Sequence, residues 1–562
     1  MNNKRRANMN IYADKYGTPN NFAVAMKEAI NDLNDGDTLV LENKEYNIHR
    51  DFCQSKIIHM TNTDSFKNPT KYFGVLLENK NNITIDGNGA TLLFHGDMCA
   101  LAILGCNNVK LKNFSIRYQC PSNAEMKVAE KKGKKVKFIM PETQTWYTDG
   151  KDITFFEQSP FTKKNYWEFK NDENSYNGVL HSGKEVYRTR HSWGPFKGVK
   201  SIKRLSENEV EITYKSKKKF KVGDVYTFSQ NKNRHTCGVL VNESSNVSAE
   251  NINVHYLPGF GWLSQMSENI SFDNVNFSAY GDRVVSAFAD LIHVCGCKGK
   301  VSITNCHFEH AHDDAINIHG SFIRFKEKID EHTAVFEFVH HQQGGHIAFN
   351  PGDKAQLYYR SNLQEDGGLL TVKKCEDDIE NKTAKVTFEE KLPDDIECKY
   401  MKQPNIVVEN KTYCPDVEIS DCTFEAIPTR GVLCTSSGKV RIHNNKFSNC
   451  SMAHIFISND AYLWYESGPV RDVEIYSNTF VMQDVPKMNQ RECSGVLIKP
   501  YMLGVARKPV HKNISIYGNY FNVCRDRAVT AYLVDGLNIC GNYCDGSSSI
   551  KTRKCRKVYI QK

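Results

Sequence analysis

The sequence predicts an all-β fold, namely a right-handed parallel β-helix with an N-terminal capping helix and two inserted small antiparallel β-barrel domains. Three observations support this prediction. A short phrase, Asn-Val/Ile-x-Ile/Phe-x-x-Asn/Cys-x-Phe, recurs ten times along the 562 residues. Several copies begin 23 residues apart, as at Val247 and Ile270 and again at Ile514 and Leu537. Two long stretches without the phrase interrupt the series.

Each copy of the phrase alternates apolar and polar residues, as a β-strand with one buried face does. A coil of about 23 residues cannot bury its apolar side alone, and stacking successive coils closes a continuous core. The Asn after the short strand suits the turn, because Asn tolerates left-handed backbone angles and can bond to the Asn of the next copy. The LxxLxLxxN pattern of leucine-rich repeats is missing.

The repeat and its interruptions divide the chain into five segments. Residues 1–118 are predicted to form the cap and the first coils, 235–321 the middle coils, and 413–562 the last coils. Residues 119–234 and 322–412 are predicted to be the inserted barrels.

The N-terminal segment begins with a predicted helix. Thr18 and Pro19 open it, and apolar residues follow at helical spacing as far as Leu33. A stacked coil leaves an open end with unpaired backbone groups, so a covering helix is expected there.

Both inserts alternate apolar and charged residues, as in Glu209–Tyr214 and Thr383–Phe388. They also resemble each other, since Phe220–Asp224 parallels Phe349–Asp353. This pattern predicts antiparallel strands with one solvated face. Whether the inserts wall a cleft or serve assembly stays open at this stage, and so does a homo-oligomeric state.

The charge pattern argues against a nucleic-acid partner. Lys and Arg total 73 against 65 Asp and Glu, a net charge of +8 with no basic face. The runs Lys131–Lys137 and Lys215–Lys221 are interpreted as solvated hairpins. The sequence contains no stretch of 18 apolar residues, so no transmembrane helix is predicted. The 19 cysteines lack the paired spacing of zinc sites, so no structural metal is predicted.

Three aspartates carry the strongest chemical signal. Asp313 and Asp314 are adjacent, and Asp290 lies 23 residues before Asp313, which is the coil period. Neighbouring carboxylates raise one another's pKa, so such a pair is costly unless the protein uses it. Equal phase on successive coils would bring all three together outside the β-helix. This arrangement suits a general acid and a general base at a glycosidic bond.

Further residues are predicted to bind the sugar because they lie near the aspartates or can stack on a pyranose face. They are His293, His312, Asn317, His319, Trp262, Arg430, Trp464 and Glu466. Two alternatives to an active site stay open: a ladder of Asp and His that only satisfies turns, and a metal site formed by His312, Asp313, Asp314 and His319.

At these residues the chain resembles glycoside hydrolase family 110, the bacterial exo-acting α-1,3-galactosidases that remove terminal α-galactose from blood-group-B-type glycans. The phrases Ala289–His293 and His312–Asn317 carry the resemblance most specifically. It implies cofactor-free and metal-free hydrolysis with inversion, with Asp290 as general acid and Asp313 or Asp314 as the water-activating base. It also implies export, although no apolar signal segment follows the basic start of the chain.

The doublet is similar to that of the polygalacturonases, another inverting β-helix family. Their Asn-Thr-Asp is Phe-Ala-Asp at 288–290 here, and neither Gly-His-Gly nor Arg-Ile-Lys is present to bind a uronate. A neutral galactoside is therefore the expected substrate. A polygalacturonase-like hydrolase, a polysaccharide lyase and a non-enzymatic carbohydrate-binding β-helix stay as alternatives.

Overall fold

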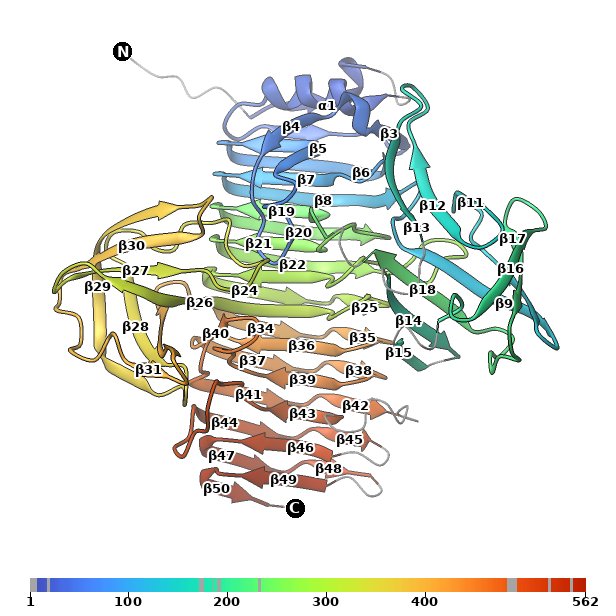
Figure 1. Ribbon diagram of the computed structural model, residues 1–562. Coiled ribbons are helices and arrows are strands. Elements are labelled where there is room, and N and C mark those ends of the chain that lie inside the picture. The colour runs from blue at the N-terminus through green and yellow to red at the C-terminus, as the bar shows by residue number, and fades with distance from the viewer. Residues whose placement is uncertain are drawn as a thin grey trace, which may run out of the picture.

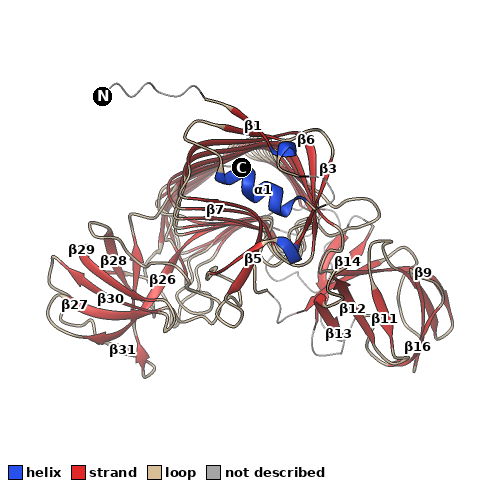
Figure 2. Cartoon of the chain, turned by 90° about the horizontal axis from the view of Figure 1, so that it is seen from above, coloured by secondary structure: helices blue, strands red, loops and turns tan. Residues whose placement is uncertain are grey.

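The computed structural model describes residues 8–17, 21–170, 176–183, 185–189, 194–230, 234–482, 493–523, 527–545 and 549–561. It confirms the predicted β-helix. The coils stack in one column with helix α1 (Phe22–Asn31) across the N-terminal end, and the two inserts project to either side (Figure 1, Figure 2). Thr18 and Pro19, the predicted start of this helix, lie outside the described residues.

The first wall of the β-helix is a parallel sheet of short strands. Its members are β1 (Asn10–Tyr12), β2 (Thr38–Val40), β3 (Glu45–His49), β6 (Asn81–His95), β8 (Asn107–Tyr118), β20 (Ser245–Val254), β22 (Glu268–Phe277), β24 (Lys298–Thr304), β25 (His307–Glu309), β34 (Asp416–Ser420), β35 (Thr423–Glu425), β37 (Lys439–His443), β38 (Lys446–Ser448), β41 (Asp472–Tyr476), β42 (Thr479–Met482), β44 (His511–Tyr517), β45 (Tyr520–Val523), β47 (Val534–Cys540), β48 (Tyr543–Cys544) and β50 (Arg556–Ile560).

The second wall is also parallel and carries the candidate site. It contains β5 (Thr70–Glu78), β7 (Cys99–Leu104), β19 (Val239–Asn242), β21 (Trp262–Gln265), β23 (Ile292–Cys295), β26 (Ile316–Lys328), β36 (Arg430–Thr435), β39 (Ala453–Ile457), β43 (Ser494–Ile498), β46 (Arg527–Tyr532) and β49 (Ser549–Arg553). Strands β4 (Gln54–Ile57) and β40 (Glu466–Ser467) pair antiparallel with β5 and β26.

The register matches the repeat. Val247 pairs with Ile270, Val417 with Val440 and Ile514 with Leu537. Because equivalent positions stack, the final Phe of the phrase forms an internal column of parallel rings, with centroids 4.4 to 5.2 Å apart from Phe277 to Phe521. These aromatic contacts stabilise the stack from β22 to β45.

Asparagines at the turns form ladders, as the repeat predicts. Asn269 has a φ of 54° and donates to Asn246 on the previous coil at 3.0 Å. A second, buried ladder runs through Asn445, Asn478 and Asn519, where each amide bonds to the next. These ladders satisfy backbone groups at the corners, where the strands cannot.

The second insert closes into the predicted barrel. Strand β26 continues out of the β-helix and pairs with β27 (Thr333–Glu337) and β33 (Ile406–Asn410). The ring is completed through β30 (Thr383–Phe388), β29 (Glu365–Asp378) and β28 (Lys354–Tyr359). A small hairpin is added by β31 (Lys399–Tyr400) and β32 (Gln403–Pro404).

The first insert has its own apolar core and two antiparallel sheets. The larger has the order β15-β14-β18-β9-β10-β17-β16, so in the described residues it is an open sheet rather than a closed barrel. These strands are β9 (Ala124–Lys132), β10 (Lys135–Ile139), β14 (Tyr176–Ser182), β15 (Glu185–Thr189), β16 (Val199–Arg204), β17 (Glu209–Tyr214) and β18 (Val225–Gln230). The smaller sheet contains β11 (Trp146–Thr148), β12 (Ile153–Gln158) and β13 (Asn165–Lys170).

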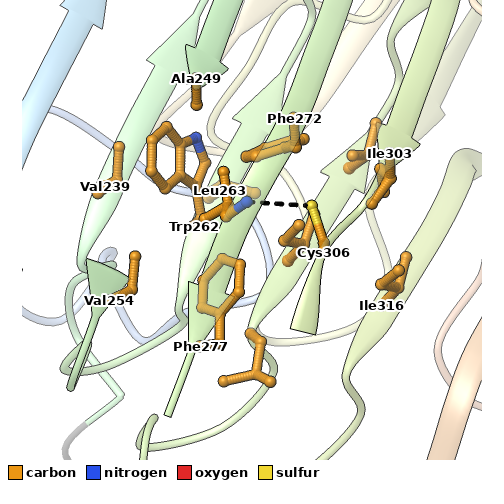
Figure 3. Close-up of a cluster of buried hydrophobic side chains, with 14 of the residues drawn as sticks. Val239, Ala249, Val254, Trp262, Leu263, Phe272, Phe277, Ile303, Cys306 and Ile316 are labelled. Atoms are coloured by element: carbon orange, nitrogen blue, oxygen red, sulfur yellow. Dashed lines mark hydrogen bonds between the residues drawn. The ribbon is translucent and has the colours of Figure 1, made fainter. Parts of the chain in front are cut away.

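The interior of the β-helix is packed with apolar side chains. Figure 3 shows Trp262, Phe272 and Phe277 packed inside the middle coils, where the backbone N–H of Val275 donates to the Cys306 sulfur at 3.4 Å. Two short 3-10 helices, Ala13–Lys15 and Arg50–Phe52, complete the described elements. In the part of the chain that the structure describes, no helix has the length and apolar character needed to cross a bilayer.

Candidate active site

The site lies where the chain enters three consecutive strands of the second wall. Ile292, Ile316 and Val432 are stacked partners in β23, β26 and β36. Each is preceded two residues earlier by a charged residue, which is Asp290, Asp314 or Arg430. These three side chains therefore occupy one column. The coil is one residue longer than the sequence predicts at this point, so Asp290 stacks on Asp314 and not on Asp313.

The structure brings the three predicted aspartates together. One carboxylate oxygen from each of Asp290, Asp313 and Asp314 lies within 4.8 Å of the others. The backbone N–H of Asp314 donates to Asp290 Oδ1 at 3.2 Å, which joins the two coils directly. These nearest oxygens lie closer together than the about 6.5–9.5 Å that sequence reasoning expected between the two carboxyl groups of an inverting pair.

Arginines compensate the clustered negative charge. Arg430 Nη2 donates to Asp314 Oδ2 at 2.6 Å, and its backbone N–H donates to Oδ1 at 3.1 Å. The Thr429 hydroxyl donates to the same Oδ1. Asp313 forms ion pairs with Arg188, and with Arg234 at 3.9 Å. Asp313 and Asp314 thus each have an arginine partner, whereas no arginine of the described residues forms an ion pair with Asp290.

The three carboxyls consequently differ in acidity. Burial, followed by the charges of Asp313 and Asp314, raises the pKa of Asp290 well above its ordinary value. Burial acts in the same direction on Asp313, but Arg188, Arg430 and Arg234 outweigh it and lower its pKa. Burial raises the pKa of Asp314 despite Arg430. A protonated Asp290 beside an ionised Asp313 is the arrangement that acid–base catalysis requires.

Two of the predicted sugar-binding histidines lie behind Asp290 instead of in front of it. His293 has no exposed surface, and its Nδ1 lies 3.0 Å from Asp290 Oδ2. His319 is buried next to it, with 2.8 Å between the two Nε2 atoms. His293 thus contacts the carboxyl of Asp290 and His319 contacts His293, and sugar binding by these two residues stays a prediction.

His312 is also buried, and its side chain contacts the first insert. Its Nε2 lies 2.9 Å from the hydroxyl of Thr227 on strand β18, so it packs against the first insert. Burial, with a smaller effect of Arg188, lowers the pKa of His312 to about 3. The histidine stays neutral and fixes the insert beside the aspartates.

The position of Trp262 contradicts the sequence prediction that this residue binds the sugar. Its side chain is 1% exposed and packs edge-on against Phe272 at 5.1 Å inside the β-helix (Figure 3). The residue is in β21, where alternate side chains point inward, so the ring is part of the core and cannot stack on a sugar.

Glu466 and Asn317 belong to the site. Glu466 Oε1 lies 3.6 Å from His319 Nε2, and Asn62 donates to the same oxygen at 3.5 Å. Burial, followed by Asp460, raises the pKa of Glu466 to about 8, and a hydrogen bond from Asn317 opposes this shift. Asn317 itself is buried in β26 and pairs in register with His293.

Trp464 is two residues from Glu466 on an exposed loop. Its ring is 40% exposed and lies on His340 of the second insert, with 4.3 Å between ring centroids. The Asp460 carboxylate accepts three backbone N–H groups of this loop, from Tyr462, Leu463 and Trp464. Trp464 is thus a rigidly held aromatic surface, of the kind on which a sugar can stack.

Sequence reasoning missed Arg188, Arg234, Thr429 and Phe260. Arg188 is on β15 of the first insert, far from the aspartates along the chain, so no spacing signalled it. Thr429 adjoins the predicted Arg430 and could have been found. Phe260 holds the same column position as Asp290 one coil earlier, and Arg234 lies over its ring at 4.9 Å.

The aspartate oxygens are close enough to share a small cation. Three guanidinium groups already neutralise them, however, and a divalent ion would have to displace or approach those groups. The donors therefore fit a metal poorly. His307, Glu309 and Glu425 form a second possible cation set away from these residues, on adjacent strands of the first wall.

Comparisons with known proteins show what this chain is similar to. A family model described as GLAA-B beta-barrel domain II matches residues 333–399, inside the second insert. "Alpha-1,3-galactosidase A" of Bacteroides thetaiotaomicron is 32% identical over 540 residues, which cover 92% of this chain and 88% of that protein. "Alpha-1,3-galactosidase B" of Phocaeicola vulgatus is 28% identical, with 92% and 86% covered. Among solved structures, a family 28 exopolygalacturonase of Yersinia enterocolitica matches 98% of this chain and 78% of its own, at 8% identity and a TM-score of 0.38.

Proposed function

Because the chain belongs to the α-1,3-galactosidase family, and is therefore a glycoside hydrolase, we propose that it removes terminal α-1,3-linked galactose from the non-reducing ends of glycans. We propose exo-acting, inverting and metal-independent hydrolysis, with blood-group-B-type and linear α-1,3-galactosyl glycans as substrates. The observation that carries the proposal is the cluster of Asp290, Asp313 and Asp314, whose carboxyls have opposed acidities.

The roles follow from these acidities. Asp290 is the general acid, because its carboxyl is protonated and can give a proton to the glycosidic oxygen. Asp313 is the base that takes a proton from the attacking water. Its side chain is the most exposed of the three, at 19%. Asp314 has both oxygens occupied by Thr429 and Arg430, and it holds Asp290 through its backbone N–H.

The pairing of the arginines supports a neutral substrate. Among the described residues, Arg430 is paired with Asp314, and Arg188 and Arg234 are paired with Asp313, so none of these three is set apart to bind a uronate. The same arginines take the place of a metal ion as the balancing charge, which supports metal-free hydrolysis. We therefore expect full activity after dialysis against EDTA.

The test is incubation with a terminal α-1,3-galactosyl oligosaccharide, followed by proton NMR of the first galactose released. Initial β-galactose supports inversion, and initial α-galactose would instead assign retention, which the short carboxyl separation makes the main rival. Polygalacturonate serves as the contrasting substrate. An unsaturated product or release of galacturonic acid, with no release of galactose, would reject the proposal.

Leaving-group chemistry tests the division of roles. Asp290→Asn should lower kcat/KM at least a hundredfold on the oligosaccharide. The decrease should be much smaller on an aryl α-galactoside, because its leaving group needs no proton. Asp313→Asn should be equally impaired on both substrates and be rescued by azide. If Asp313→Asn shows the leaving-group dependence instead, the acid is Asp313.

A further inference from the structure

A chain of hydrogen bonds runs from Asp290 into the protein. Asp290 Oδ2 lies 3.0 Å from His293 Nδ1, His293 Nε2 lies 2.8 Å from His319 Nε2, and His319 Nδ1 lies 2.7 Å from the carbonyl oxygen of Gly320. Both histidines are buried, with exposed fractions of 0% and 3%. Every link is short enough to need one proton between its two atoms.

The last link sets the direction of the others. A carbonyl oxygen can only accept, so His319 Nδ1 carries a proton and donates to Gly320. A neutral imidazole has one N–H and one lone pair, so His319 Nε2 is then an acceptor. His293 Nε2 must therefore donate to it, which leaves His293 Nδ1 without a proton. The remaining contact, between Nδ1 and Asp290, needs a proton that only the carboxyl can supply.

We propose that His293 and His319 are positioning residues that keep the carboxyl of Asp290 protonated by presenting a lone pair to it. The inference rests on the proposed function only in giving this protonated carboxyl the role of catalytic acid. In the resting protein an ionised Asp290 would face an imidazole lone pair, so that state is disfavoured. When Asp290 acts as the acid, its Oδ2–H bond breaks, the hydrogen bond to His293 Nδ1 is lost, and the proton passes to the glycosidic oxygen.

The competing arrangement reverses the chain. The proton of Asp290 would move to His319, so that His319 would be an imidazolium, His293 would donate from Nδ1 and Asp290 would be ionised. That places two charges on groups buried to nine-tenths or more, where charge is expensive. The groups that face the chain are Asp313, Asp314, Arg234 and Glu466. Arg234 disfavours a cation on His293, and burial, then His319 and Arg234, lower the pKa of that histidine.

The direct test is neutron diffraction from deuterium-exchanged crystals of the full chain, which requires no substitution. We expect deuterium on Asp290 Oδ2, His293 Nε2 and His319 Nδ1. Deuterium on His293 Nδ1, or on both nitrogens of His319, would overturn the inference. This readout is independent of turnover, so it separates failure of the tautomer chain from failure of the proposed galactosidase activity.

A kinetic test uses His319→Gln. The amide of Gln can turn to donate to His293, which frees His293 Nδ1–H to bind an ionised Asp290. We expect the alkaline limb of the kcat/KM profile to move down by at least one pH unit, a tenfold loss on the alkaline side, with KM nearly unchanged. His454→Gln is the matched control, because His454 is buried in β39 and bonds to the Val481 carbonyl outside the site. An unmoved alkaline limb in a folded His319→Gln protein would refute the inference.

Discussion

At the scale of single residues, the contact between Arg430 and Asp314 is the site's most buried ion pair. The Asp314 side chain is 2% exposed, and the pair is joined at 2.6 Å. Removing one partner of a buried pair leaves an uncompensated charge and costs about 3–5 kcal/mol. Arg430→Met should therefore lower the free energy of unfolding by about that much at pH 7, measured by urea denaturation, and reduce kcat at least a hundredfold.

The loss in the free energy of unfolding of Arg430→Met should grow as pH rises, because a buried Asp314 without its arginine is tolerated only when protonated. Arg441→Met is the control, since Arg441 makes a half-exposed pair with Asp472 that is worth about 0–1 kcal/mol. Equal losses in the two variants would show that burial does not distinguish these pairs.

Glu466 gives a pH prediction. Its pKa in the folded protein is about 8, above the value of an unfolded chain, near 4.5. The folded state therefore holds a proton that the unfolded state releases, and this contribution to stability is present at low pH and is lost as pH rises from about 4.5 to about 8. Glu466→Gln keeps the shape without the titration.

We expect the melting temperature of Glu466→Gln, relative to that of the wild type, to increase steadily between pH 5 and pH 8. The exposed Glu397→Gln should run parallel to the wild type over the same range. A constant difference between Glu466→Gln and the wild type would mean that Glu466 titrates normally in the folded protein.

Residue identity alone could not settle which way a side chain faces. The three aspartates were predictable because the coil period fixes their phase, although one extra residue moved the stacked partner from Asp313 to Asp314. Trp262 looked like a sugar platform in a glycine-rich loop, yet strand alternation places it inside. Arg188 could not be predicted, because no regular spacing in the sequence relates a residue of the insert to a residue of a coil.

At the scale of elements, we expect the buried asparagine ladder to contribute more to the free energy of unfolding than asparagines on the outer face do. Asn478 accepts from the backbone and side chain of Asn445 and donates to Ile442 and Asn519. Asn478→Ala would leave several of these buried groups unpaired, at about 1–3 kcal/mol each. We expect a loss of about 3 kcal/mol or more in the free energy of unfolding.

The matched control for this ladder is Asn276→Ala, whose side chain makes one 3.3 Å bond to Asn253 on the outer face. Its loss should be about 1 kcal/mol or less. Chemical denaturation of the two variants under one condition makes the comparison. Similar losses would imply that the ladder contributes no more than an ordinary turn. The repeat predicted the existence of such ladders, but not which ones are buried, since that depends on how neighbouring coils cover the corner.

At the scale of the whole molecule, the inserts are part of the site and not appendages. The first insert reaches the aspartates through Arg188, holds His312 through Thr227, and accepts a hydrogen bond from Ser451 at the carbonyl of Val186. The second insert supports Trp464 through His340. The site is therefore assembled from segments that the sequence keeps more than a hundred residues apart.

Arg188→Gln tests whether this assembly matters for catalysis. Arg188 helps to keep the pKa of Asp313 low, so without it the carboxyl needs a higher pH to act as a base. The acid limb of the pH–rate profile should move up and kcat/KM at pH 6 should fall tenfold to a hundredfold. Stability should change by less than about 1 kcal/mol, because Arg188 is 39% exposed. Arg204→Gln, on the same insert but lying over Trp146, should leave both properties unchanged. If Arg188→Gln keeps the wild-type profile, the first insert does not tune the base, and its contact with Asp313 is only a rim ion pair.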